Sequence, residues 1–141
     1  MISVKELRVG NTVKDDNGRL WRVGCVTGFN NNKPSVVLER HGCEGIIKWY
    51  SGENDVIPIA INDNLLDIIG FKRDKERDVY RGYGRSIEVF DNEYYIGLRD
   101  LEDDFSDSLQ VKTLHQLQNI LIDLYEYDMI NIEKLYDYTG K

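Results

Sequence analysis

The chain has few of the residues that build covalent or metal-bound frameworks: two cysteines and two histidines among 141 residues. A disulfide between Cys25 and Cys43 would not persist in a reducing compartment, so we expect free and mostly buried thiols. Structural zinc sites usually contain closely spaced cysteine pairs, and the sequence has none. We interpret the four soft ligands, Cys25, His41, Cys43 and His115, as unrelated thiols and imidazoles. The sequence therefore predicts neither a metal site nor a cofactor.

The chain also lacks long hydrophobic runs. No apolar stretch approaches the roughly 20 residues that a helix needs to cross a bilayer. Residues 1–7 have neither the basic region nor the apolar region of an export signal. We therefore expect no contact with a membrane and a cytoplasmic location.

Positive charge is scarce relative to negative charge, most of all in the second half. The net charge is −7, from 18 basic and 25 acidic residues. Residues 1–70 hold 8 basic and 9 acidic residues, which leaves −1, whereas residues 71–141 hold 10 and 16, which leaves −6. Nucleic acids bind through basic surfaces, so a chain with a pI near 4.8 is not expected to be a general nucleic-acid binder.

The first sixty residues contain a series of short extended segments. They are rich in Val, Ile, Trp and Tyr and are separated by Gly, Asn, Asp or Pro. The predicted strands are residues 12–14, 20–29, 35–40, 46–50 and 55–59. Tight turns are predicted at residues 15–18 and 40–43. This spacing favours a small, partly open β-barrel of SH3-like type over residues 1–60, because closure removes exposed edges.

Residues 61–141 are predicted to form an α+β lobe packed on the barrel, either as a separate domain or as part of one compact domain. The first helix of this lobe has both ends specified. Asn62 caps its start, and Gly70 ends it in the left-handed conformation, which lets Phe71 fold back on Leu66. The whole chain is thus expected to be an α+β protein.

Antiparallel strands follow that helix. They are predicted near residues 78–81 and at residues 86–90 and 94–98, with a turn at 91–93 joining the last two. An acidic loop over residues 100–107 then leads to the C-terminal helix.

The C-terminal helix begins at Thr113, where Gln116 completes a capping box. Leu114, Leu117, Leu121 and Leu124 repeat at helical spacing and predict its buried face. His115, Gln118 and Asn119 form a polar strip beside this leucine seam. We interpret the strip as a docking face that is partly exposed or hydrogen-bonded at the lobe boundary. Consequently, His115→Ala is expected to cost much less stability than Leu117→Ala.

Three stretches, in this order and spacing, resemble a family of small uncharacterised proteins from gut anaerobic bacteria, their phages and mobile elements. They are Leu7-Arg8-Val9-Gly10-Asn11-Thr12-Val13, Pro58-Ile59 with Leu65-Leu66-Asp67-Ile68-Ile69-Gly70-Phe71, and Leu114-His115-Gln116-Leu117-Gln118-Asn119. Together they cover about a fifth of the chain. The resemblance implies no activity. After Asn119 the chain departs from the family pattern, since a Tyr- and acid-rich extension precedes Thr139-Gly140.

No motif assembles a nucleophile, a base and an oxyanion donor, so no catalytic residue is predicted. The leading hypothesis is a non-enzymatic protein-interaction module of phage or mobile-element origin, with an unidentified protein partner and an undetermined oligomeric state. Its candidate binding residues are His115, Gln118, Asn119, Trp21 and Trp49.

Two alternatives stay open. One is a weak nucleic-acid binder or a nucleic-acid mimic, in which Trp21 and Trp49 stack on bases. The basic residues of the first lobe that could assist are Arg19, Arg22, Lys33, Arg40 and Lys48. The other is a small enzyme that uses His115 as acid or base, because imidazole titrates near neutral pH.

Overall fold

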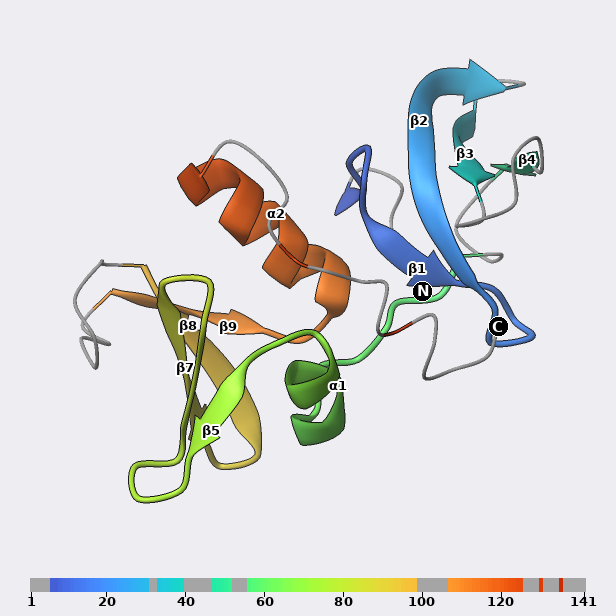
Figure 1. The fold of residues 1–141 in the computed structure, drawn as a ribbon. Helices are drawn as coiled ribbons and strands as arrows, with labels where there is room; N and C mark the ends of the chain where they lie inside the picture. Colours follow the sequence, from blue (N-terminus) through green and yellow to red (C-terminus); the bar gives the residue numbers. More distant parts are fainter. Residues whose placement is uncertain are drawn as a thin grey trace.

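The computed structural model describes residues 6–30, 33–39, 47–51, 56–98 and 107–125, together with Ile130 and Leu135. These residues form a mixed α+β structure, as predicted, and the structure consists of two antiparallel sheets and two helices (Figure 1). The longer helix, α2 (Leu114–Tyr125), lies between the two sheets. No described helix is long and apolar enough to span a membrane.

The first sheet has four strands in the order β1-β2-β3-β4. They are β1 (Thr12–Lys14), β2 (Leu20–Asn30), β3 (Lys33–Glu39) and β4 (Ile47–Ser51). Four of the five strands predicted for this lobe are therefore confirmed. The fifth was predicted at residues 55–59. Of these, residues 56–59 are described, and they form a single bridge, between Ile57 and Lys14, instead of a strand. The predicted turn at residues 40–43 lies outside the described residues.

Asp15 organises the predicted turn between β1 and β2. Its Oδ1 accepts hydrogen bonds from the backbone N–H groups of Asn17 and Arg19, each at 2.9 Å. Its Oδ2 accepts from the indole N–H of Trp21, also at 2.9 Å. Gly18 has φ +76°, which suits a residue without a Cβ. The turn is confirmed, and the same carboxylate satisfies the polar group of a buried tryptophan.

β2 carries an irregularity in its pairing with β3. Its register with β3 shifts between Val23 and Cys25, at Gly24. A Cβ at Gly24 would lie 2.5 Å from the Glu39 carboxylate, so a side chain there would displace that group. Seven buried apolar residues of this lobe form one cluster: Leu7, Val13, Trp21, Val23, Val36, Leu38 and Val56. Among the described strands, the sheet stays open and does not close into a barrel.

The helix α1 (Asp63–Ile68) has both predicted ends. The Asn62 side chain accepts a hydrogen bond from the Leu65 N–H at 2.8 Å. Gly70 has φ +109°, and the Phe71 N–H donates to the Leu66 carbonyl at 2.9 Å, which is the bond expected when a helix ends in a left-handed residue. A Cβ at Gly70 would also lie 2.9 Å from the Tyr83 hydroxyl oxygen, so glycine is required there twice over.

The second sheet has five strands in the order β5-β6-β7-β8-β9. They are β5 (Lys72–Asp74), β6 (Val79–Gly82), β7 (Arg85–Phe90), β8 (Glu93–Gly97) and β9 (Ser108–Val111). The predicted hairpin is confirmed, with Asp91 and Asn92 both at positive φ between β7 and β8. β5 and β9, the two edge strands, were not predicted. Part of the acidic loop predicted at residues 100–107, residues 100–106, lies outside the described part of the chain.

α2 contributes the leucine seam to the main core. Leu114, Leu117 and Leu121 are fully buried, while Leu124 is half-buried. At the start of the helix the Thr113 hydroxyl accepts from the Gln116 N–H at 3.4 Å. The Gln116 side chain accepts from the Lys112 N–H at 2.9 Å, one residue before its partner in an ordinary capping box. Leu20 of β2 packs into the same core as these leucines, so the two lobes share buried surface.

Candidate binding site at the edge of β9

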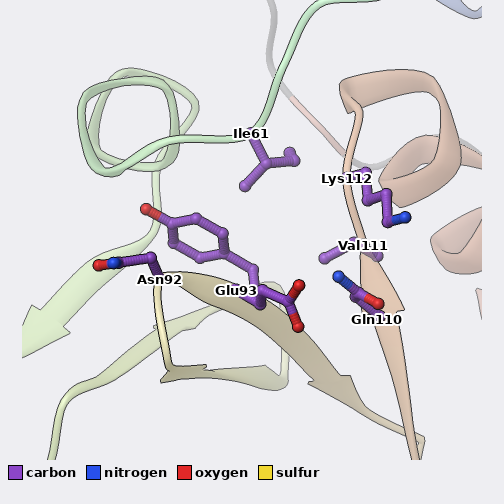
Figure 2. Close-up of a pocket in the computed structure, with 7 residues that line it drawn as sticks. Ile61, Asn92, Glu93, Gln110, Val111 and Lys112 are labelled. Carbon is purple, nitrogen blue, oxygen red and sulfur yellow. The ribbon is translucent and has the colours of Figure 1, made fainter.

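A solvent-open cavity of about 240 Å³ lies where the start of β8 meets the end of β9 (Figure 2). Its walls come from the segment before α1, the β7–β8 turn, β8 and β9. The lining residues are Ile61, Asn92, Glu93, Tyr94, Gln110, Val111 and Lys112. In Figure 2 the side chains of Glu93, Gln110 and Lys112 gather on one side of the space, and Asn92 lies on the other. The cavity thus offers apolar walls with polar and charged groups at its rim.

The cavity lies where residues 59–61, which pair with the chain just after β9, turn away from the edge of the sheet. Residues 59–61 run antiparallel to residues 112–114: the Ile61 N–H donates to the Lys112 carbonyl at 2.9 Å, and the Leu114 N–H donates to the Ile59 carbonyl at 2.8 Å. The Asn62 cap then turns the chain into α1. The remaining edge of β9 loses its neighbour at that point.

The backbone of β9 presents unpaired groups along this edge. Successive residues of a strand point their N–H and C=O groups to opposite sides. The Asp107 carbonyl accepts from the Leu98 N–H at 2.8 Å, so Asp107 faces β8, and so does Leu109 two residues later. Ser108 and Gln110 consequently face outward, and no described residue bonds to their backbone groups.

One wall of the cavity is fixed by a polar network. The Tyr94 hydroxyl donates to Asp63, the first residue of α1, at 2.6 Å, and Arg73 lies 3.7 Å from the same carboxyl group. The Tyr94 hydrogen bond holds the pKa of Asp63 below its usual value. Burial, together with Asp63, raises the pKa of Tyr94, so this hydroxyl stays protonated and continues to donate near neutral pH. The network ties α1 to β8 beside the cavity.

Two exposed apolar side chains lie on the strands next to the cavity. Phe90, at the end of β7, is 67% exposed, and Leu109 of β9 is 48% exposed. They lie on opposite faces of the sheet, because Phe90 pairs with Glu93 and Leu109 pairs with Ile96, so each would meet a different side of a bound partner.

The structure places Gln118 and Asn119 of the predicted strip inside the junction between the lobes. The Gln118 Oε1 accepts from the Thr12 N–H at 2.8 Å, and its Nε2 donates to the Gly10 carbonyl at 3.4 Å. The Asn119 Oδ1 accepts from the Asn11 side chain at 2.7 Å. Asn119 Nδ2 also donates to the Glu6 carbonyl at 3.0 Å. The strip therefore docks residues 6–12 of the same chain, and two of the three stretches that carry the family resemblance meet here.

His115 lies deeper than predicted. It is 2% exposed, so the expectation of a partly exposed or hydrogen-bonded side chain is wrong. Neither ring nitrogen makes a hydrogen bond with a described residue. Burial lowers the pKa of His115, and the nearby Glu6 carboxylate offsets part of that effect. The leucine pattern alone did not predict the burial of His115. The buried face of α2 is wider than the row of leucines and also includes His115 and Gln118.

We expect this histidine to make the protein less stable in mild acid. Its ordinary pKa is 6.5, and the folded value is lower. As the pH falls below 6.5, the unfolded chain takes up a proton that the folded protein does not, so stability falls by up to about 1.4 kcal/mol per pH unit until the folded pKa is passed. Urea titrations at about pH 7 and about pH 5 should show this loss, and His115→Leu should lose less stability over the same range. An equal loss in the variant would contradict the assignment to His115.

The two predicted tryptophans are not shown at a common surface. Trp21 is 1% exposed in the core of the first lobe, so its ring is not available for stacking. Trp49 belongs to β4 opposite Val37, but its side chain lies outside the described part of the structure.

The residues around the cavity were not predicted from the sequence. Gln110 and Lys112 lie between the acidic loop predicted at residues 100–107 and the helix predicted from Thr113, in a stretch for which no element was predicted.

The soft ligands of the sequence are not gathered in the described structure. Cys25 is an exposed free thiol, which corrects the expectation of a buried one, and His115 is buried. His41 and Cys43 lie outside the described residues. Within the described ranges, no three His, Cys, Asp or Glu side chains form a cluster that could hold a metal ion.

Comparisons of the chain with protein-family models, with curated proteins and with solved structures gave no match. The geometry of the chain itself therefore carries the functional argument.

Proposed function

We propose that the protein is a non-enzymatic protein-interaction module, and that the cavity beside the open edge of β9 is its contact site. The observation that carries this proposal is the combination of a cavity with unpaired backbone groups on the adjoining strand. None of the 7 lining residues is a Cys, His, Ser or Thr; the ionisable ones are Glu93, Tyr94 and Lys112, and the Tyr94 hydroxyl is bound to Asp63. A site of this composition suits binding better than chemistry.

We further propose that the first lobe is a partly open barrel of SH3-like type. The bridge to Lys14 puts Ile57 on the free side of β1, so the order becomes Ile57-β1-β2-β3-β4. The irregularity at Gly24 suits a long strand that bends from one side of a barrel to the other. The family resemblance supports an origin in a phage or mobile element. The free thiol of Cys25 suits a reducing cytoplasm.

No observation on the described residues favours either alternative, the nucleic-acid binder or mimic and the enzyme that uses His115. Of the two tryptophans proposed to stack on nucleic-acid bases, Trp21 is buried, and the Trp49 side chain lies outside the described residues. Arg22, one of the suggested phosphate contacts, pairs with Glu39 at 3.3 Å. An enzyme acting through His115 would need access to the imidazole, which burial denies.

The interaction proposal is tested by placing a charge on the candidate surface. We expect Leu109→Glu to reduce recovery of a crosslinked partner from the native host by about tenfold, because burying a carboxylate at an interface costs binding energy. Val9→Glu is the matched control: Val9 is 55% exposed and lies in the first lobe. Quantitative mass spectrometry of crosslinked pull-downs with wild type and both variants makes the measurement.

Thermal melts should first show that both variants fold like the wild type. Equal recovery of the partner from all three proteins would remove β9 as the contact site. Recovery of this chain alone from the wild type would overturn the interaction proposal itself.

A further inference from the structure

We propose that the partner binds as an extended, basic peptide strand that adds to β9, an inference that rests on the proposed function and identifies what its site receives. Strand addition is a recognised way for a sheet edge to bind a peptide, because main-chain hydrogen bonds supply affinity while alternate side chains supply specificity. Three features of the β9 edge point to this occupant.

The first feature is a short antiparallel hydrogen-bond ladder that ends before it reaches β9. Residues 59–61 already pair antiparallel with residues 112–114 through the bonds from Ile61 to Lys112 and from Leu114 to Ile59. The next outward-facing residues along the same edge are Gln110 and then Ser108. A peptide running in the direction of residues 59–61 would continue the ladder over this stretch, about 7 Å for each two residues. Its end nearest Ile61 would reach the cavity.

The second feature is the charge beside the edge. Glu93 and Gln110 lie on the same face of the sheet, because Tyr95, two residues from Glu93, is paired with Gln110. Glu93 is exposed, and its carboxylate accepts a hydrogen bond from the Tyr95 hydroxyl at 2.8 Å on this face. Lys112 stands at the end already occupied by Ile61, so a positive side chain of the peptide is favoured opposite Gln110, near Glu93, and disfavoured next to Lys112. The −6 charge of residues 71–141 also attracts a basic partner.

The third feature is the exposed apolar side chain between Ser108 and Gln110. Leu109 points to the opposite face from Gln110, and it is 48% exposed although its cross-strand partner, Ile96, is fully buried. An apolar side chain of the peptide opposite Leu109 would cover it. The edge therefore selects a strand that alternates basic and apolar residues.

The test uses the full chain and a defined probe: an acetylated and amidated peptide of about eight residues that alternates lysine and valine. We expect the peptide to slow hydrogen exchange at the backbone amides of Ser108 and Gln110, measured by NMR. The same peptide with its alternate edge-facing amides N-methylated should bind about tenfold more weakly, since it cannot complete the ladder. A version with glutamate in place of lysine should also bind more weakly.

Variants of the protein separate the ladder from the charge. Gln110→Pro removes an outward N–H without removing a bond to β8, so it should weaken peptide binding about tenfold, whereas Gln110→Thr keeps the N–H and should bind like the wild type. Should Gln110→Pro fail to fold, Glu93→Gln supplies an independent test through the loss of charge alone.

Each result decides the proposal. Absence of binding, equal binding of the N-methylated peptide, equal binding of the glutamate peptide, or protection at residues other than Ser108 and Gln110 overturns the basic-strand inference. None of these results touches the proposed function, which stands or falls on the differential crosslinking of Leu109→Glu and Val9→Glu.

Discussion

Leu117→Ala should lower the free energy of unfolding by about 2–5 kcal/mol, a large share of the stability of a domain of this size. Leu117 is 0% exposed and belongs to the core that α2 shares with α1 and the second sheet. Alanine would remove buried methyl groups and leave a cavity that rigid neighbours cannot fill. Urea denaturation followed by tryptophan fluorescence and circular dichroism measures the loss.

Asp123→Ala on the same helix is the control for this experiment. Asp123 pairs with Arg8 in an exposed ion pair, which solvent and salt screen, so we expect little change in stability. A loss for Leu117→Ala no larger than that of the control would mean that α2 does not pack as described.

The burial of His115 changes one comparison drawn from the sequence. We predicted that His115→Ala would cost much less than Leu117→Ala because the imidazole stands off the leucine seam. At 2% exposure the imidazole fills core volume, so its truncation also leaves a cavity and the expected gap between the two variants narrows.

Features that depend on adjacent residues were predictable from the sequence. The cap at Asn62, the left-handed end at Gly70 and the turn at Asp91 and Asn92 each need a particular residue type at a particular place. Their physics is local, so the sequence alone fixes them. The same holds for the turn around Asp15, whose side chain bonds to backbone groups within four residues.

Edge strands and the site beside them were not predictable in this way. β9 is the short segment Ser-Leu-Gln-Val, which follows an acidic stretch and alternates polar and apolar residues over only four positions. Its extended conformation comes from pairing with β8, a contact that no pattern within the segment specifies. The cavity depends in turn on where residues 59–61 leave β9, which is a property of three segments together.

The polar strip of α2 was likewise predictable only in its local part. Helical spacing placed Gln118 and Asn119 together beside the leucines, and that much was predicted. Their partners, Thr12 and Asn11, precede them by 106 and 108 residues, so the identity of the docked surface could come only from the fold. The strip binds the first lobe of its own chain.

Gln118→Leu should therefore loosen the junction between the lobes and lower the free energy of unfolding by about 1–3 kcal/mol. Gln118 is 0% exposed, and leucine has a similar size, so packing is largely kept. What is lost is the acceptor of the Thr12 N–H and the donor to the Gly10 carbonyl, and buried groups without partners are costly.

A second measurement separates this local effect from a general loss of stability. Amide exchange at Thr12 should accelerate in Gln118→Leu more than exchange at Val111, whose backbone pairs within the second sheet. Uniform acceleration at both amides would assign the loss to global unfolding. Unchanged exchange at Thr12 would show that the Gln118 amide does not hold the first lobe, because an N–H deprived of its buried acceptor must open more readily than one that keeps it.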